Sequence, residues 1–287
     1  MEDELLDSFG KAEKISTEAI NFAKPLVKTD AKILDFAEAT ENKIKELGGK
    51  PAWPVNISIN EIAAHYTPEL GDTGTFKEGD LVKIDIGVQV NGCPWDRAFT
   101  VCIGKKSHPL IDASAEALEK ALKIMKAGTK VFEISEVTEN TVNGLGFNVV
   151  RNLSGHGIEQ YHQHAHPMIP NSRNTIQDEL ESGKVYAMEV FTTNGSGVVM
   201  ESSPTGIFKY AQDKPVRMWE ARKILEISKT EFDQLPFCKR WLKGISPVKM
   251  DMALRQLAET SSIETYPPLK EKSNGLVAQT EETVIIK

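Results

Sequence analysis

The sequence predicts an α+β fold made of two related halves. Segments whose apolar residues recur with the period of a helix are interleaved with short apolar runs typical of strands. A motif of three landmarks also occurs twice, in the same order, along the chain. The length of 287 residues corresponds to about one to two domains.

Helical spacing is found in three regions before residue 150. The first 47 residues are expected to be helical, with a break at Pro25. Residues 111–127 are expected to form an amphipathic helix that ends at Gly128. A further helix is expected over about 131–145. Strand-like apolar runs lie between and after these helical regions, at 81–90, 93–103, 147–150, 184–191 and 284–286.

Residues 215–260 have a different character. Three consecutive stretches, 218–227, 232–242 and 248–260, have helical spacing without a strand-like run between them. We therefore predict a helical insertion in an otherwise strand-rich C-terminal half. Ordinary helices of the same domain would explain the pattern equally well.

The repeated motif has three landmarks in each copy. They are an N-apolar-S segment at 56–58 and 152–154, an H-x-x-P segment at 65–68 and 164–167, and a glycine followed six residues later by an acid within a strand, Gly79 to Asp85 and Gly183 to Glu189. Each landmark alone is weak, but their common order indicates a duplicated half. A duplication predicts a pseudo-twofold fold that brings two histidines and two carboxylates toward a shared axis.

Asp85 lies inside an apolar run, where a carboxylate is costly unless it has a partner. A hydrogen-bonded structural Asp is one explanation. The following Asn91-Gly92 pair offers another, because it is a strong signal for a two-residue hairpin loop. Paired positions in that hairpin sum to 183, so Asp85 and Asp96 become diagonal neighbours, with Cβ atoms roughly 7–8 Å apart. Pro94 in the second strand counts against this register.

Two carboxylates this close on one face repel each other unless they share a proton or a cation. Glu189 lies in a similar apolar strand, and Glu281 lies just before the last apolar run. Four carboxylates are more ligands than one cation usually needs. They suit a pair of divalent cations roughly 3.5–4 Å apart, which bridging carboxylates can hold.

Four of the six histidines fall between residues 156 and 166. His156 lies in a glycine-flanked segment that we expect to be a bend, and with four acids nearby it is a candidate metal ligand. His65 and His164, which the repeat relates, are candidate donors to a substrate or a tetrahedral intermediate. His162 and His166 have weaker claims, and His108 is expected at the surface.

In this order, Asp85, Asp96, His156, Glu189 and Glu281 resemble the five-ligand set of the pita-bread metallopeptidases. The chain is most similar to the type II methionine aminopeptidases of the single-domain archaeal kind. Further matching segments are 54–68, 71–73, 83–87, 152–156 and 277–281. The resemblance implies a pita-bread fold with pseudo-twofold α/β halves, a single catalytic domain over 1–287, and at 208–265 the helical insertion typical of type II enzymes.

The same resemblance implies the removal of the initiator methionine from nascent peptides whose second residue is small, by a hydroxide activated by two metal ions. By analogy, Asp85 would bind one metal, and His156 and Glu189 the other. Asp96 and Glu281 would bridge the two, and Glu189 would also shuttle a proton. The ions could be Co, Mn, Fe or Zn.

The substrate contacts are implied in the same way. His65 and His164 would contact the scissile peptide, while Trp53 and Tyr266 fall where the family places aromatic residues of the methionine pocket. The chain departs from the family pattern at a few positions. They are Trp53 for a smaller aromatic residue, Gln163 for an apolar one, Val190 after Glu189, and Glu282 for a histidine.

Two alternatives remain open at this point. A proline-specific pita-bread peptidase, such as a prolidase or an aminopeptidase P, shares the ligands but usually has a large N-terminal domain, whereas only about 50 residues precede the first motif here. A non-catalytic pita-bread binding protein would be expected to lose ligands. The charge balance of 34 − 41 = −7 also disfavours a broad nucleic-acid surface.

The remaining expectations concern the location of the protein in the cell and its partners. The acidic N-terminus is unlike a signal peptide, and apolar runs long enough to cross a membrane are absent. Three cysteines without C-x-x-C spacing indicate neither a disulfide framework nor a structural zinc site. We expect a cytoplasmic monomer that acts on nascent polypeptide N-termini, without DNA or membrane partners, with ribosome association left open.

Overall fold

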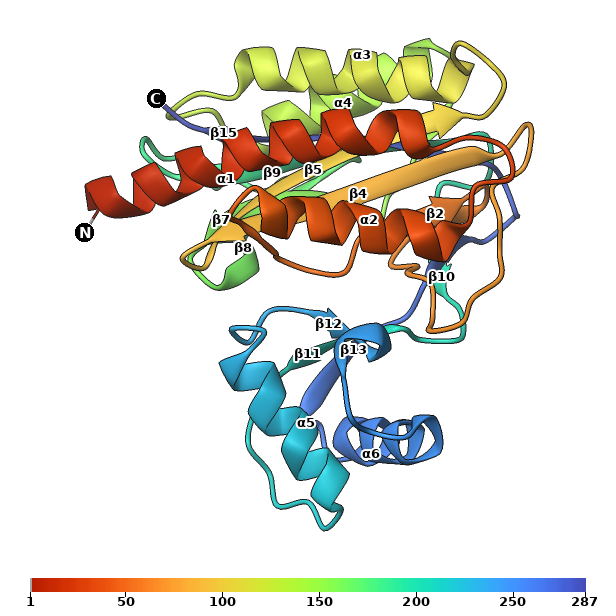
Figure 1. Ribbon diagram of the computed structural model, residues 1–287. Helices are drawn as coiled ribbons and strands as arrows, with labels where there is room; N and C mark the ends of the chain where they lie inside the picture. Colours follow the sequence, from red (N-terminus) through yellow and green to blue (C-terminus); the bar gives the residue numbers. More distant parts are fainter. Residues whose placement is uncertain (1) are drawn as a thin grey trace.

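The computed structural model describes residues 2–287 and has a large sheet covered by helices, with a smaller lobe below it (Figure 1). Within these residues, nine antiparallel strands form the large sheet, in the order β1-β4-β5-β15-β9-β7-β8, with β2 paired to β4 and β6 to β9. Their bounds are β1 Lys50–Pro51, β2 Asn56–Ile59, β4 Leu81–Val90, β5 Cys93–Cys102, β6 Asn148–Val149, β7 Ser154–Glu159, β8 His162–Pro170, β9 Val185–Thr193 and β15 Val277–Ile285.

Two pairs of helices cover the two halves of this sheet. One pair is α1 (Glu2–Ala23) and α2 (Ile33–Glu46), joined through a short 3-10 helix at Lys24–Leu26. These two helices pack on the half of the large sheet that contains β1, β2, β4 and β5. Helices α3 (Pro109–Ile124) and α4 (Val131–Gly144) pack on β9, β15 and β8. A small sheet of β10 (Val199–Glu201), β14 (Leu269–Glu271) and β3 (Ile62–Ala64) lies at the lower edge.

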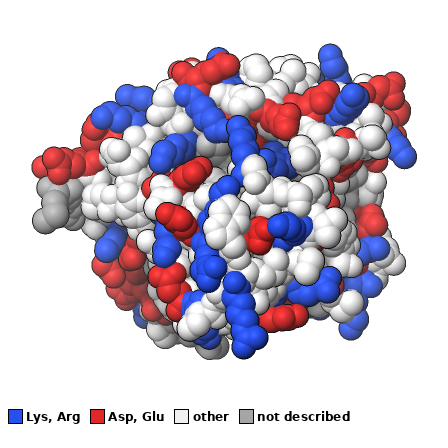
Figure 2. Space-filling view, turned by 60° about the horizontal axis from the view of Figure 1, so that its bottom comes forward, with Lys and Arg blue, Asp and Glu red and all other residues white. Residues whose placement is uncertain are grey.

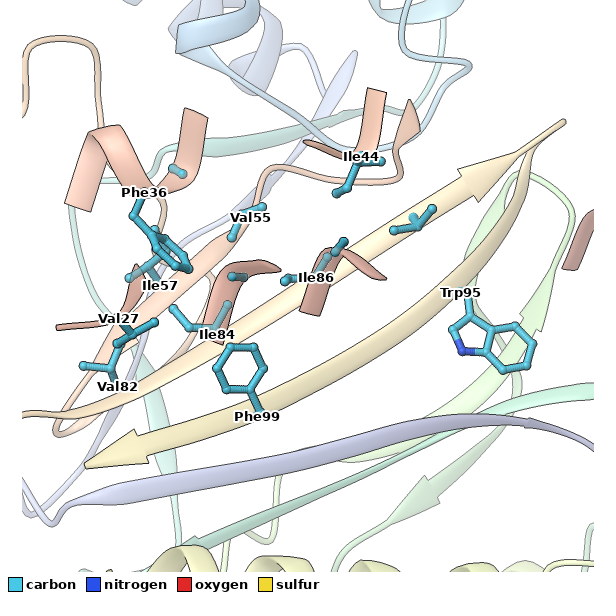
Figure 3. Packing of buried hydrophobic residues seen from close by; sticks show 14 of the residues in the cluster. Val27, Phe36, Ile44, Val55, Ile57, Val82, Ile84, Ile86, Trp95 and Phe99 are labelled. Atoms are coloured by element: carbon cyan, nitrogen blue, oxygen red, sulfur yellow. The ribbon is translucent and has the colours of Figure 1, made fainter. Parts of the chain in front are cut away.

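The core of the first half lies between helices α1 and α2 and the sheet around the β4–β5 hairpin (Figure 3). Phe36 and Ile44 of α2 belong to one buried cluster with Ile84 and Ile86 of β4 and Phe99 of β5. Burial of each such side chain contributes about 1.5–3 kcal/mol. These contacts fix one face of β4, so that the opposite face is free to carry polar groups.

The duplication predicted from the three landmarks is present in the backbone. Gly79 and Gly183 both have positive φ, +86° and +80°, and each begins a strand that carries a candidate ligand. The N–H of Gly79 donates to the carbonyl of Ile103, and the N–H of Gly183 donates to that of Ile286, at 3.0 and 2.8 Å. The β4–β5 pair therefore corresponds to the β9–β15 pair, which confirms the α+β fold with two related halves.

The predicted hairpin register is confirmed. Strands β4 and β5 pair so that positions sum to 183 from Leu81–Cys102 to Val90–Cys93 without a shift. Pro94 is tolerated because β15 pairs with β5 only at Ala98 and Arg97, so that no ladder hydrogen bond on that side needs an N–H from Pro94.

One of the three helices expected in the smaller lobe, residues 207–266, is absent. The lobe contains α5 (Trp219–Thr230) and α6 (Pro247–Glu259), but 232–242 is not a helix. Asp233 and Gln234 have positive φ and Pro236 follows, so the chain turns, forms the short strand β12 (Phe237–Cys238) and then a 3-10 turn at Lys239–Trp241. The lobe also has strands, since β12 pairs with β11 (Ile207–Tyr210), and β11 pairs with β13 (Ile263–Tyr266).

Other boundaries also differ from expectation. Helix α3 ends at Ile124, four residues before Gly128. The last strand begins at Val277, so Glu281 lies inside it and not before it. The expected bend at 154–157 is part of strand β7, because its glycines serve close packing: a Cβ at Gly155 would lie 2.6 Å from the carbonyl oxygen of Ala187.

The surface carries charges of both signs. On the face seen when the underside of Figure 1 is brought forward, Lys and Arg side chains gather in a band down the middle (Figure 2). The net charge of −7 is thus unevenly distributed. Across residues 2–287, the helices are too short or too polar to span a lipid bilayer.

Candidate active site

The candidate ligands form a row across the centre of the large sheet. Asp85 on β4 pairs with Ala98 on β5, Ala98 pairs on its other side with Glu281 on β15, and Glu281 pairs with Glu189 on β9. Because strand side chains alternate between faces, Asp96, two residues before Ala98, projects from the same face. The structure therefore brings all four predicted carboxylates to one place.

His156 joins the row from the neighbouring strand. It pairs with Ala187 on β9, two residues before Glu189, which puts it on the same face. Its Nδ1 lies 3.1 Å from the carbonyl oxygen of Gly157, and its Nε2 lies 3.8 Å from Oδ2 of Asp96. A proton on Nδ1 directed at the carbonyl leaves the lone pair of Nε2 facing the acids, as a metal ligand requires.

The electrostatics of the row call for a cation. Burial raises the pKa of Asp85 to about 6, and burial together with the neighbouring carboxylates raises the pKa of Asp96, Glu189 and Glu281 well above the usual range. Burial lowers the pKa of His156 to about 4, so its ring is neutral at pH 7. Among the described residues, the ion pairs of these four acids involve His156 and neither Lys nor Arg.

The donor set fits a divalent metal. Ligand atoms of Asp96, His156 and Glu281 lie within 4.8 Å of one another and are buried. Oδ1 of Asp96 and Oε1 of Glu281 have no hydrogen-bond partner, although such atoms are costly to bury unpaired. Carboxylate oxygens with an imidazole nitrogen suit Mn, Fe, Co or Zn.

The two repeat-related histidines lie beside this row, next to Tyr266 of β13. The ring of His164 lies 4.6 Å from that of His156, and the rings of His65 and His164 lie 5.4 and 6.3 Å from the ring of Tyr266, centroid to centroid. His65 has φ +64°, a strained conformation for a residue other than glycine. Burial lowers the pKa of His65 to about 4. The side chain of His164 is exposed on β8, but partial desolvation, together with the neighbouring His156 and His65, lowers its pKa as well, so both rings are neutral at pH 7.

Trp53 has a role that the sequence did not indicate. It lines the pocket above the row, as expected, but its indole Nε1–H also donates to Oδ1 of Asp85 at 2.9 Å. The ring lies against Gly87, where a Cβ would come within 2.3 Å of it. Gly87 is thus needed for the close approach that lets Trp53 hold a candidate ligand.

Gln279 is a site residue that sequence reasoning missed. Its Nε2 lies 3.3 Å from Oε2 of Glu189 and 3.2 Å from Oε2 of Glu281. Its position two residues before Glu281 on one strand is the signal that could have revealed it. The apolar remainder of the pocket also went unassigned: Ala64, Leu153, Phe191, Ile207 and Pro236.

Of the residues that depart from the family pattern and the histidines that are weaker candidates, some line the pocket and others lie away from it. Gln163 lines the pocket, whereas Glu282 forms an ion pair with Arg97 at 2.5 Å and Val190 packs in the core under α3 and α4. His162 and His166 are exposed on β8. His108 is half-buried and caps α3, accepting a hydrogen bond at Nδ1 from the N–H of Leu110.

Known proteins are similar to this chain in sequence and in fold. The model for metallopeptidase family M24 matches residues 7–218. A methionine aminopeptidase of Thermococcus onnurineus is 47% identical over 279 residues, covering 96% of this chain and 95% of the relative. Among solved structures, a thermophilic Arx1 aligns with a TM-score of 0.89 at 18% identity, over 99% of this chain and 88% of that one. A methionine aminopeptidase of Thermotoga maritima aligns at 0.72 and 22%, over 99% and 93%.

A row of strand acids under one pocket on a duplicated α/β sheet defines a class of metal-dependent peptidases, and this chain belongs to metallopeptidase family M24. Within that family it is similar over nearly its whole length to methionine aminopeptidases of archaea, at 35–47% identity.

Proposed function

We propose that this protein is a methionine aminopeptidase, which hydrolyses the first peptide bond of polypeptides that begin with methionine and have a small second residue. One observation carries the proposal: Asp85, Glu281 and Glu189 lie in one register row, with Asp96 and His156 beside it. The similarity to archaeal methionine aminopeptidases over nearly the full chain supports the same activity.

The proposed cofactor is a pair of divalent ions, drawn from Co, Mn, Fe and Zn. Asp85 would hold one ion, His156 and Glu189 the other, and Asp96 and Glu281 would bridge them. When bound, the ions would supply Lewis-acid activation of water and anchor the free amine of the substrate. Trp53 and Gln279 would orient Asp85, Glu189 and Glu281 through the hydrogen bonds described above.

The protein's own groups would complete the reaction. Glu189 is the proposed proton carrier, because burial and the charges of Asp96 and Asp85 raise its pKa and so favour uptake of a proton from the attacking water. His65 and His164, neutral at pH 7, would donate hydrogen bonds to the scissile peptide. Trp53 and Tyr266 would enclose the methionine side chain.

A proline-specific peptidase and a non-catalytic binding protein are less well supported. The relatives at 35–47% identity are methionine aminopeptidases, and their alignments cover 96% or more of this chain. All five candidate ligands are also present. The proposed substrates are nascent polypeptide N-termini, processed in the cytoplasm by a monomer, at or near the ribosome.

The test is release of methionine from a Met-Ala-Ser peptide. Purified protein is treated with chelator, reloaded separately with Co²⁺, Mn²⁺, Fe²⁺ or Zn²⁺, and compared with the chelated sample. Asp96→Asn is expected to lower kcat/KM by about 100-fold or more, whereas Asp178→Asn, on an exposed loop, serves as the matched control. No methionine release with any metal would refute the proposal, and cleavage of Xaa-Pro peptides instead would favour the proline-specific alternative.

A further inference from the structure

The pocket contains a buried amide among apolar side chains. Gln163 on β8 is only 2% exposed, and its Nε2 lies 3.4 Å from the hydroxyl of Tyr266, while its Oε1 has no partner. The same pocket is lined by Trp53, Phe191 and Ile207. An unpaired amide atom in such surroundings carries a desolvation cost that a ligand group can remove.

The amide can present either a donor or an acceptor to a ligand. In one orientation Nε2 faces Tyr266 and Oε1 is unpartnered. Rotation of the terminal amide by half a turn lets the Tyr266 hydroxyl donate to Oε1, and the N–H groups then take the place of the unpartnered oxygen of this pocket-lining residue. Tyr266 can make this change because its hydroxyl is otherwise 3.4 Å from Glu264, a long hydrogen bond.

A ligand that uses this donor must carry an acceptor on an unbranched side chain of methionine's length. The methionine thioether is only a weak acceptor. Its oxidised form, methionine sulfoxide, has the same chain and carries a polar S=O group. An apolar pocket would strip water from that oxygen without replacing its hydrogen bonds, whereas the amide of Gln163 can replace one.

We propose that this protein also removes N-terminal methionine sulfoxide, with Gln163 Nε2–H donating to the sulfoxide oxygen while Oε1 accepts from Tyr266. This inference rests on the proposed function, because it assumes that the first side chain of the substrate occupies this pocket. The reaction is the same hydrolysis: the peptide bond breaks, water supplies a proton to the new amine and a hydroxyl to the carboxyl, and the sulfoxide is unchanged.

The position of the amide adds a stereochemical expectation. The sulfoxide sulfur is chiral, so the two epimers direct their oxygen to opposite sides of the chain. Gln163 lies on β8, and the walls formed by Trp53 and Ile207 are apolar. The epimer whose oxygen points at Gln163 gains the hydrogen bond from its amide, whereas the other epimer turns its oxygen away from Gln163, so one epimer is expected to be the preferred substrate.

The experiment compares three peptides: Met-Ala-Ser and the two separated sulfoxide epimers of the same sequence, all with one batch of metal-loaded protein. One epimer is expected to be cleaved with kcat/KM within about tenfold of the methionine peptide. In Gln163→Leu the ratio of sulfoxide to methionine kcat/KM is expected to fall by about tenfold, the effect of one lost hydrogen bond. Gln163→Met provides a second, unbranched variant, and Gln177→Leu, on the exposed loop before β9, is the control whose ratio stays unchanged.

The outcomes separate the two proposals. Cleavage of the methionine peptide without either sulfoxide epimer overturns the inference and leaves the proposed function intact. Cleavage of none of the three peptides counts against the proposed function itself. Equal cleavage of both epimers, or an unchanged ratio in both Gln163 variants, shows that the amide does not select the substrate and also overturns the inference.

Discussion

Glu281 and Glu189 are paired directly across β15 and β9 in the centre of the large sheet. Side chains in such pairs have Cβ atoms about 4.5–5.5 Å apart, and like charges there are destabilising. Gln279 donates to both carboxylates, and Asp85 lies in the same register row. Acids placed in this way repel each other unless they share a proton or a cation.

Metal binding should therefore stabilise the protein markedly. A divalent ion at 100 times its Kd adds about 2.7 kcal/mol to the folded state. For a chain of 287 residues, that corresponds to a rise in Tm of about 4–5 °C. Thermal unfolding of the chelated protein, with and without added Mn²⁺ or Co²⁺, measures this rise.

Glu281→Gln provides the matched control for that rise. The substitution removes one of two facing charges, so the metal-free Tm should stay the same or increase, while the rise on adding metal should be lost for the most part. An equal rise in the variant would show that the ions stabilise the protein from elsewhere.

Trp53→Phe should weaken metal binding although Trp53 is not itself a ligand. The variant keeps an aromatic ring against Gly87 but loses the N–H that holds Oδ1 of Asp85. Loss of such a supporting hydrogen bond typically costs 10–100-fold in metal affinity, so Kd should rise by about that factor. Calorimetric titration of the chelated protein measures it, and Trp219→Phe, whose ring is exposed, should leave Kd unchanged.

Glu271 should make the protein sensitive to acid. Burial alone would raise its pKa, but hydrogen bonds from Ser196, Gly275 and Ser273 outweigh this and lower the pKa to about 2. A carboxyl whose pKa is lower in the folded state stabilises the fold above its ordinary pKa, and this contribution is lost as the pH falls toward 2. Glu271→Gln should therefore have a lower Tm than the unchanged protein at pH 7, with the gap narrowing below about pH 4.5; a gap independent of pH would contradict this origin.

The sequence predicted the structure best where it depends on residues close together along the chain. The Asn91-Gly92 turn determined the register of β4 on β5, because a two-residue loop leaves one pairing. It could not determine that Glu281 pairs with both Ala98 and Glu189, since those strands are far apart along the chain. The resemblance to a known family supplied the grouping of the ligands, and the structure shows how the strands achieve it.

Short strands and individual side-chain hydrogen bonds could not be predicted from the sequence. β12 has two residues, and its apolar Phe237 fits a helical pattern as well as a strand. The bend expected from the glycines beside His156 is wrong, because these glycines allow β7 to pack closely on its neighbours. The indole of Trp53 was recognised as a pocket wall, but its bond to Asp85 depends on a tertiary contact.

The lobe is held to the body by Arg240, which forms two hydrogen bonds to Glu41 of α2, at 2.8 and 3.0 Å, with both side chains almost fully buried. Trp241 donates to the same carboxylate at 2.9 Å, and the backbone N–H of Val55 donates to it at 3.2 Å. Since the lobe contributes Ile207, Pro236 and Tyr266 to the pocket, this junction positions part of the substrate site.

Glu41→Gln should therefore affect both stability and substrate binding. Removing one partner of a buried pair leaves the other charge uncompensated and typically costs about 3–5 kcal/mol, which denaturant unfolding measures. KM for a Met-Ala-Ser peptide should rise, because the lobe's wall of the pocket is no longer held. Glu220→Gln, which breaks the pair with the exposed Lys249 within the lobe, should cost at most about 1 kcal/mol and leave KM unchanged. If both variants behaved alike, the Glu41–Arg240 junction would not be what positions the lobe.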